Sequence, residues 1–217
     1  MHRAHTSNIG FNVPRSLSVG KLPLMVALWG LLICTSGCNL HTDVPLVYHH
    51  TDAYPVGGPL ISAASLYVAP VQDWRQDQKQ IGANKEHGTP IPAYQTVGTA
   101  TQFVHDGAAA RLAEAGVIVV KTLDEADRSL FLVINYMWVE ETTRYDARIV
   151  LQARVQDRAG ATLWSGNVEG SDSTWGRSLY PENYSQVLNN ALLQACSHLA
   201  ADPGFIKSMQ PSTGSSR

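Results

Sequence analysis

The segment from Tyr145 to Val155 is the feature of this sequence that most constrains the fold. Apolar side chains occupy every second position of it, with mostly polar residues between them. Successive side chains of a β-strand point to opposite faces, so this alternation predicts a strand with one face on a core and the other toward water. Any fold for the chain must therefore contain a sheet that is buried on one side.

Further strands are predicted on both sides of this segment. Residues 130–139 are apolar on both faces, as expected of a central strand, and the turn at 157–160 leads to another strand over about 161–170. Two earlier strands are predicted over 64–71 and 117–120. Residues 72–98 mix charge, Gly and Pro, which favours a long loop with at most a short hairpin around Ile81.

Two amphipathic helices complete the pattern. Apolar residues fall on one helical face over 101–115, with Gly116 at the C-terminal cap position, and again over 182–201. We expect an α+β two-layer sandwich. In it, one mixed, mostly antiparallel sheet of about five strands is covered on one face by two helices.

The N-terminal part of the chain has the layout of an export signal. Residues 22–33 are apolar, follow the basic Lys21 and lead into Thr35-Ser36-Gly37-Cys38. The apolar run is shorter than the ~20 residues that a membrane-spanning helix needs. The sequence predicts a signal peptide over residues 1–37, cut between Gly37 and Cys38.

This cleavage region resembles the lipobox of bacterial lipoproteins, with Thr35 in place of the usual Leu. The resemblance implies a diacylglycerol group on Cys38. It also implies that Asn39 favours transfer to the outer membrane, with the protein held on the periplasmic face. Ordinary secretion and an uncleaved anchor are the alternatives, and translation starting after Met1 is another open point.

After the signal we expect a lipidated N-terminus and flexible tether over 38–60, one domain over 61–209 and a disordered tail over 210–217. The Pro and Gly content up to Pro59 favours the tether. His49-His50 complete no metal-ligand spacing, so we assign them to this linker and expect no metal and no cofactor.

Charge and cysteine content restrict the partners further. Residues 38–217 hold 13 Lys and Arg against all 18 Asp and Glu, a balance of −5, so nucleic acid is not expected as a partner. Cys196 is the only cysteine inside the predicted domain, which excludes a disulfide there. Its place in an apolar helical pattern indicates a small buried residue rather than a reactive thiol.

The order of elements resembles the YajG-like family of bacterial lipoproteins over about residues 66–209. The residues that carry the resemblance are Leu66-Tyr67-Val68-Ala69-Pro70 with Asp73 and Arg75, Leu112 to Gly116, and Val187 to Leu192 with Asp202 and Phe205. The resemblance implies an outer-membrane lipoprotein of unsettled function.

No catalytic motif emerges from the sequence, and we expect a non-enzymatic protein. Glu140-Glu141 point to opposite faces of a strand and are interpreted as a solvated hairpin end. Trp164, Trp175, Tyr180 and Tyr184 are expected to cluster near the loop before the last helix, where Trp175, Arg177 and Tyr180 are the candidate partner-binding residues. An equally weighted alternative is that Trp164 and Tyr184 are core residues and that Trp175 only covers the end of the sheet.

The first hypothesis is an envelope accessory module that is attached to a membrane by its lipid and binds an envelope protein or glycan. The alternative is an auxiliary subunit of a lipid or lipopolysaccharide transport machine. A greasy groove between helices and sheet would favour the alternative, whereas an exposed aromatic loop on a closed core would favour the binding module.

Overall fold

The computed structural model describes residues 40–51, 64–86 and 88–210, which form one compact unit of strands and helices. The predicted signal peptide with Gly37 and Cys38 lies outside the described residues, as do residues 52–60 of the predicted tether and 211–217 of the predicted tail. The strands are β1 (Thr42–Pro45), β2 (Ser65–Val68), β3 (Gln72–Asp73), β4 (Gln80–Asn84), β5 (Ile91–Val97), β6 (Ile118–Val120), β7 (Arg128–Glu141), β8 (Arg144–Asp157) and β9 (Thr162–Trp175). The helices are α2 (Ala100–Glu114), the 3-10 turn η2 (Leu123–Glu125), α3 (Pro181–Ala201) and α4 (Pro203–Ser208).

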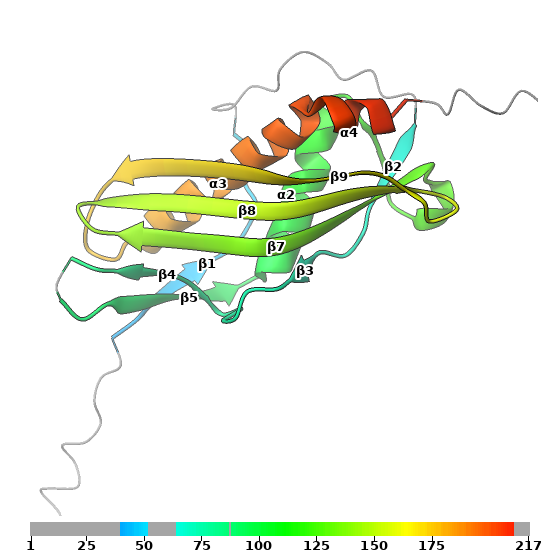
Figure 1. Ribbon diagram of the computed structural model, residues 1–217. Coiled ribbons are helices and arrows are strands. Elements are labelled where there is room, and N and C mark those ends of the chain that lie inside the picture. The colour runs from blue at the N-terminus through cyan, green and yellow to red at the C-terminus, as the bar shows by residue number, and fades with distance from the viewer. Residues whose placement is uncertain (1–39, 52–63, 87, 211–217) are drawn as a thin grey trace, which may run out of the picture. The chain divides into compact units, whose positions relative to one another are not determined.

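Three long antiparallel strands, β7, β8 and β9, dominate the sheet (Figure 1). The predicted alternation in β8 is confirmed, because its side chains from Tyr145 to Val155 are buried at every second position. β9 continues to Trp175, five residues beyond its predicted end, because it stays paired with β8 as far as Arg144. Backbone pairing with a neighbour extends this strand past the point where its own apolar pattern stops.

The expectation of about five strands was wrong, because the sheet has nine strands among the described residues and is curled rather than a flat layer. Four of the strands fall where the sequence indicated a loop or a tether. β4 and β5 form a hairpin inside residues 72–98, and β4 also pairs in parallel with β7. Gly82 lies opposite Val139, and a Cβ at Gly82 would meet the Val139 carbonyl oxygen at 2.5 Å, so the glycine permits this pairing.

The flexible tether expected over 38–60 is contradicted for its described part. β1 pairs in parallel with the edge of β5, and Val44 and Leu46 are buried in the core. The Leu46 N–H donates to the Val97 carbonyl at 2.8 Å. A four-residue strand that fills an open sheet edge is too short to show a period, so its composition alone resembled a linker.

Both long helices cover one face of the sheet, as expected. Figure 1 shows them behind the three long strands, with α3 lying along β8 and β9 and α2 packed against α3. Thr99 caps the N-terminus of α2, because its side chain accepts a hydrogen bond from the Gln102 N–H. α4 starts at Asp202, which caps it in the same way, and this short helix closes one end of the core with Phe205.

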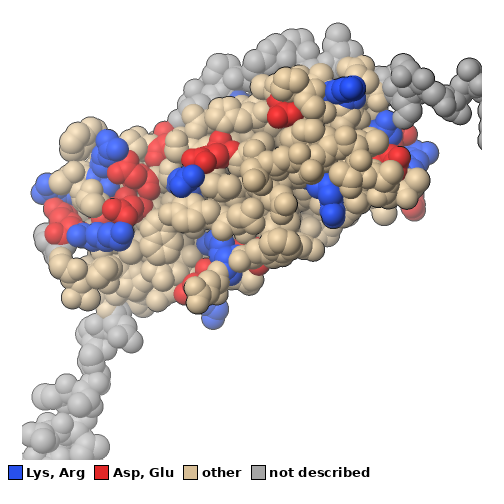
Figure 2. All heavy atoms as spheres, in the orientation of Figure 1, with Lys and Arg blue, Asp and Glu red and all other residues tan. Residues whose placement is uncertain are grey.

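The opposite face of the sheet is open among the described residues. Figure 2 shows this face: its middle is mostly uncharged, and basic and acidic side chains gather at the left end of the view. Arg148 lies over the Tyr136 ring and Arg154 over the Phe131 ring, at 5.7 and 5.3 Å from the centroids. These contacts cover part of each ring with the arginine head group while keeping its charge in water.

Candidate partner-binding site

The candidate site is the segment Trp175–Tyr180, which we call the aromatic loop. It follows β9 at the end of the sheet where β7 finishes at Glu141, and we call this the loop end. Trp175 is 79% exposed and Tyr180 58% exposed. Arg177 is paired with Glu86 of the neighbouring β4–β5 hairpin at 3.2 Å. The three residues predicted as partner-binding therefore lie at one end of the sheet.

A buried carboxylate holds this loop from beneath. Glu141 has no exposed surface. One of its oxygens accepts the Leu179 N–H at 3.0 Å, and the other accepts the Tyr184 hydroxyl at 2.9 Å. The Tyr145 hydroxyl accepts the Tyr180 N–H at 3.0 Å. These hydrogen bonds fix the loop backbone while its aromatic side chains stay outside.

The loop backbone is strained, which is consistent with this bracing. Ser178 and Leu179 have φ values of 81° and 56°, the left-handed region that favours glycine. Gly176 lies so close to the Tyr145 ring that a Cβ would meet its Cε2 atom at 2.9 Å. Such conformations persist only where the surroundings determine them, as the hydrogen bonds from Leu179 and Tyr180 do here.

The two tyrosines under the loop remain neutral hydrogen-bonding groups. Burial, and then the Glu141 carboxylate, raise the pKa of Tyr184 far above its ordinary value. Burial is also the main cause that raises the pKa of Tyr145. Their rings meet edge to face, with centroids 5.1 Å apart. Both phenols therefore keep their protons under physiological conditions, and Tyr184 acts as a donor to Glu141.

The structure decides between the two interpretations of the aromatic residues and corrects one interpretation of the carboxylates. Trp164 does not join the aromatic loop but packs against the core near the other end of β9, where its ring centroid lies 5.8 Å from that of Phe205. Tyr184 is likewise buried, as the alternative expected. Glu140 and Glu141 point to opposite faces as expected, but only Glu140 is solvated, where it pairs with Lys85. Glu141 is a core residue.

The sequence concealed Glu141 because of an irregularity in β7. Up to Ile134 the even positions point to the core, and from Met137 onward the odd positions do, since Asn135 is an extra residue in the pairing with β8. The bulge made the strand resemble one that is apolar on both faces. Continuing the pattern of Met137 and Val139 by two residues would have placed Glu141 inside.

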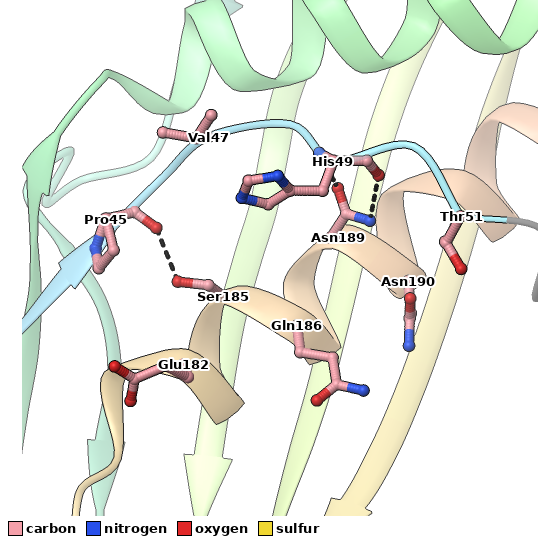
Figure 3. A pocket seen from close by; sticks show the side chains of 9 residues that line it. All are labelled: Pro45, Val47, His49, Thr51, Glu182, Ser185, Gln186, Asn189 and Asn190. Carbon is pink, nitrogen blue, oxygen red and sulfur yellow. Dashed lines mark hydrogen bonds between the residues drawn. The ribbon is translucent and has the colours of Figure 1, made fainter.

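A hollow lies where the chain crosses α3 after β1 (Figure 3). It has a volume of about 480 Å³, and both apolar and polar groups line it. The Asn189 side chain accepts from the His49 N–H at 2.9 Å and donates to the His49 carbonyl at 2.7 Å. Ser185 donates to the Pro45 carbonyl at 2.7 Å. These bonds tie residues 45–49 to α3, so this part of the expected linker is docked on the domain.

The histidines and the cysteine considered in the sequence analysis have ordinary structural contacts. Within the described ranges, no three His, Cys, Asp or Glu side chains are grouped to hold a metal ion. His50 pairs with Glu114 at 2.8 Å. Cys196 is buried as expected, and burial raises the pKa of its thiol to about 12. A thiol with that pKa is almost entirely protonated near neutral pH and is a poor nucleophile.

A comparison with protein-family models found no match, and neither did a comparison with curated proteins. Solved structures do resemble the chain. A protein of the DUF330 family from Xanthomonas campestris aligns with a TM-score of 0.52 and 15% identity, over 76% of this chain and 96% of that protein. At this identity the likeness shows a shared fold.

Two more distant structures are a protein described as a lipoprotein from Caulobacter crescentus and a minor lipoprotein from Acinetobacter baumannii. The first has a TM-score of 0.42 and 15% identity, over 52% of this chain and 86% of that protein. The second has a TM-score of 0.40 and 9% identity, over 64% of this chain and 91% of that protein. Across the part of the chain that the structure describes, no helix has the length and hydropathy to cross a membrane.

Proposed function

We propose that the protein is a cell-envelope lipoprotein, attached to a membrane through Cys38, that acts as a non-enzymatic binding module. The observation that carries the proposal is the aromatic loop, where Trp175 and Tyr180 are exposed on a backbone that Glu141 and Tyr145 fix in place. Exposed aromatic and Arg side chains on a rigid support are typical of contact surfaces. Membership of the YajG-like family and the periplasmic face of the outer membrane belong to the same proposal.

The transport alternative expects an apolar groove between the helices and the sheet. In the described residues that space is filled by core side chains, among them Phe103, Leu112 and Leu192. An exposed loop on a closed core is the arrangement expected of a binding module, which is why we place the transport role second.

Attachment is tested by mass spectrometry of the mature N-terminus and by membrane fractionation. We expect a lipid-modified Cys38 at the first position and loss of the protein from the membrane fraction in Cys38→Ser. Cys34→Ser is the matched control, since Cys34 lies in the predicted leader, and it should fractionate as the wild type. An unmodified Cys38 or an intact leader in the mature protein would contradict the proposal.

A further inference from the structure

The start of β1 lies at the loop end of the sheet. Thr42 pairs with Ala93 of β5, and that register continues through Gly82 and Val139 of the next strands to Ala147. Ala147 in turn is paired with Asp172, three residues before Trp175. In Figure 1 the arrowheads of β7 and β9 and the blue start of β1 all lie on the left side. Leu40, two residues before Thr42, is thus level with the last residues of β7 and β9.

The contact between β1 and α3 also places the start of β1 level with the loop end. Ser185 binds the Pro45 carbonyl, and both elements run away from the loop end. Tyr180 precedes Ser185 by five residues, about 7 Å along a helix. Thr42 precedes Pro45 by three residues, about 10 Å along a strand. Tyr180 therefore lies level with the first residues of β1.

Cys38 is only two residues before Leu40, so its Cα can be no more than about 7 Å from that of Leu40. Had residues 38–60 been a flexible tether, the domain could have turned any face toward its anchor. Since β1 begins at Thr42 and is fixed in the sheet, the end of the domain that must face the anchoring membrane is the loop end.

The exposed groups at this end match the interfacial region of a bilayer. Trp175 and Tyr180 are exposed at this end, and Leu40, just before β1 at the same level of the sheet, is 61% exposed. Trp and Tyr are enriched at membrane–water interfaces because their rings are apolar and their N–H and O–H groups bond to water or head groups. Single exposed apolar side chains are common on protein surfaces and need no explanation. These side chains differ because they lie at the end of the domain from which the chain leads to the proposed lipid site.

The charges at the loop end are balanced. Lys85 pairs with Glu140, Arg144 with Asp146 and Arg177 with Glu86. Figure 2 shows basic and acidic side chains interspersed at the left end of the view. A surface of this kind has no strong preference for anionic lipid, so aromatic insertion rather than electrostatic attraction would govern its contact with a bilayer.

We propose that the aromatic loop binds the lipid surface to which Cys38 is attached, with Trp175 and Tyr180 in the head-group region, so that the domain stands on the membrane in one orientation. This inference rests on the proposed lipid attachment of Cys38. The partner of Trp175, Arg177 and Tyr180, which the proposed function left unspecified, is then the lipid bilayer itself. A second contact beside the covalent one restricts rotation of the domain and directs the open face of β7 and β8 sideways along the membrane.

The test uses the full lipidated mature protein in phosphatidylcholine vesicles whose acyl chains are brominated near the head groups, with unbrominated vesicles as reference. Bromine quenches tryptophan fluorescence on contact. We expect quenching in the wild type, its loss in Trp175→Phe and its persistence in Trp74→Phe. Trp74 is the matched control because it is 66% exposed but follows β3, which pairs with Val133 and Ile134 in the middle of β7.

Addition of salt or of phosphatidylglycerol should leave the quenching unchanged. Equal quenching in both variants, or none in a wild type that floats with the vesicles, would overturn this inference and leave the lipoprotein proposal standing. A protein without lipid on Cys38 that does not float would overturn both. If the protein floats with the vesicles but Trp175 contributes no quenching, the loop does not bind the bilayer, and an envelope protein or glycan remains as its partner.

Discussion

Two tryptophans of the same strand, Trp164 and Trp175, have opposite surroundings at the two ends of β9. Trp164 packs against Phe205, and Gly204 at the start of α4 approaches its ring closely. Trp175 is 79% exposed, and in the part of the chain that is described nothing covers it. One end of the sheet is closed by apolar packing, whereas the loop end is held by a buried carboxylate and two phenols.

The difference shows that a loop can be held without covering its side chains. At the α4 end, burial of aromatic surface supplies the stability, so the aromatic residues cannot be exposed as well. At the loop end, hydrogen bonds that the backbone N–H groups of Leu179 and Tyr180 donate to Glu141 and Tyr145 hold the loop. Trp175 and Tyr180 are then free to contact something outside the domain.

The largest expected effect concerns the closed end. Phe205→Ala removes a fully buried ring and leaves a cavity beside Trp164, so we expect the free energy of unfolding to fall by about 3–5 kcal/mol. Urea denaturation followed by circular dichroism measures it. Trp175→Ala is the control at the loop end and should change stability by less than about 0.5 kcal/mol. Similar losses in the two variants would contradict the comparison between the ends.

A smaller effect is expected from the carboxylate under the loop. Glu141→Ala leaves the Leu179 N–H and the Tyr184 hydroxyl without their acceptor, and we expect a loss of about 2–3 kcal/mol by the same denaturation assay. Glu141→Gln keeps an acceptor oxygen and should lose less. Limited proteolysis should cut the alanine variant first within residues 176–180. Cleavage elsewhere, with this loop protected, would show that Glu141 does not hold it.

The smallest effect appears at alkaline pH. The pKa of Tyr184 is raised in the folded state, whereas in the unfolded chain it ionises near 10.0. Above that pH the unfolded state binds fewer protons than the folded one, so the free energy of unfolding falls as pH rises, by about 1 kcal/mol between pH 10 and 11. Below pH 9 the contribution is constant.

Denaturation of Tyr184→Phe over the same pH range isolates this contribution, because the variant should lack that part of the slope. Tyr180→Phe is the matched control, since Tyr180 is 58% exposed, and it should keep the wild-type slope. If Tyr184→Phe shows the full alkaline slope, Tyr184 does not stay protonated in the folded state.

Strong periodic patterns gave correct elements from sequence. The strand around Tyr145–Val155 and both amphipathic helices lie where they were predicted, because each buries a regular stripe of side chains. The patterns failed where pairing rather than composition decides the structure. β1, β4 and β5 are short, contain Pro or Gly, and are strands because β7 and its neighbours offer them backbone hydrogen bonds.

The candidate site divides in the same way. Trp175, Arg177 and Tyr180 could be named from sequence because they are close together in the chain and belong to types common at contact surfaces. Glu141 and Tyr145 could not, since they reach the loop through strand pairing and through the bulge at Asn135. The distant location of Trp164 likewise follows from the length of β9, which the sequence underestimated.

The sequence by itself determined the half-buried strand, the two helical stripes and the predicted lipid site at Cys38, since each depends on local spacing of side chains. Only the tertiary structure decided that residues 42–45 join the sheet next to β5, and hence at which end of the sheet Leu40 lies. The physical reason is that a short edge strand gains its stability from hydrogen bonds to its partner strand. For β1 that partner is β5, where Ala93 pairs with Thr42 from 51 residues further along the chain.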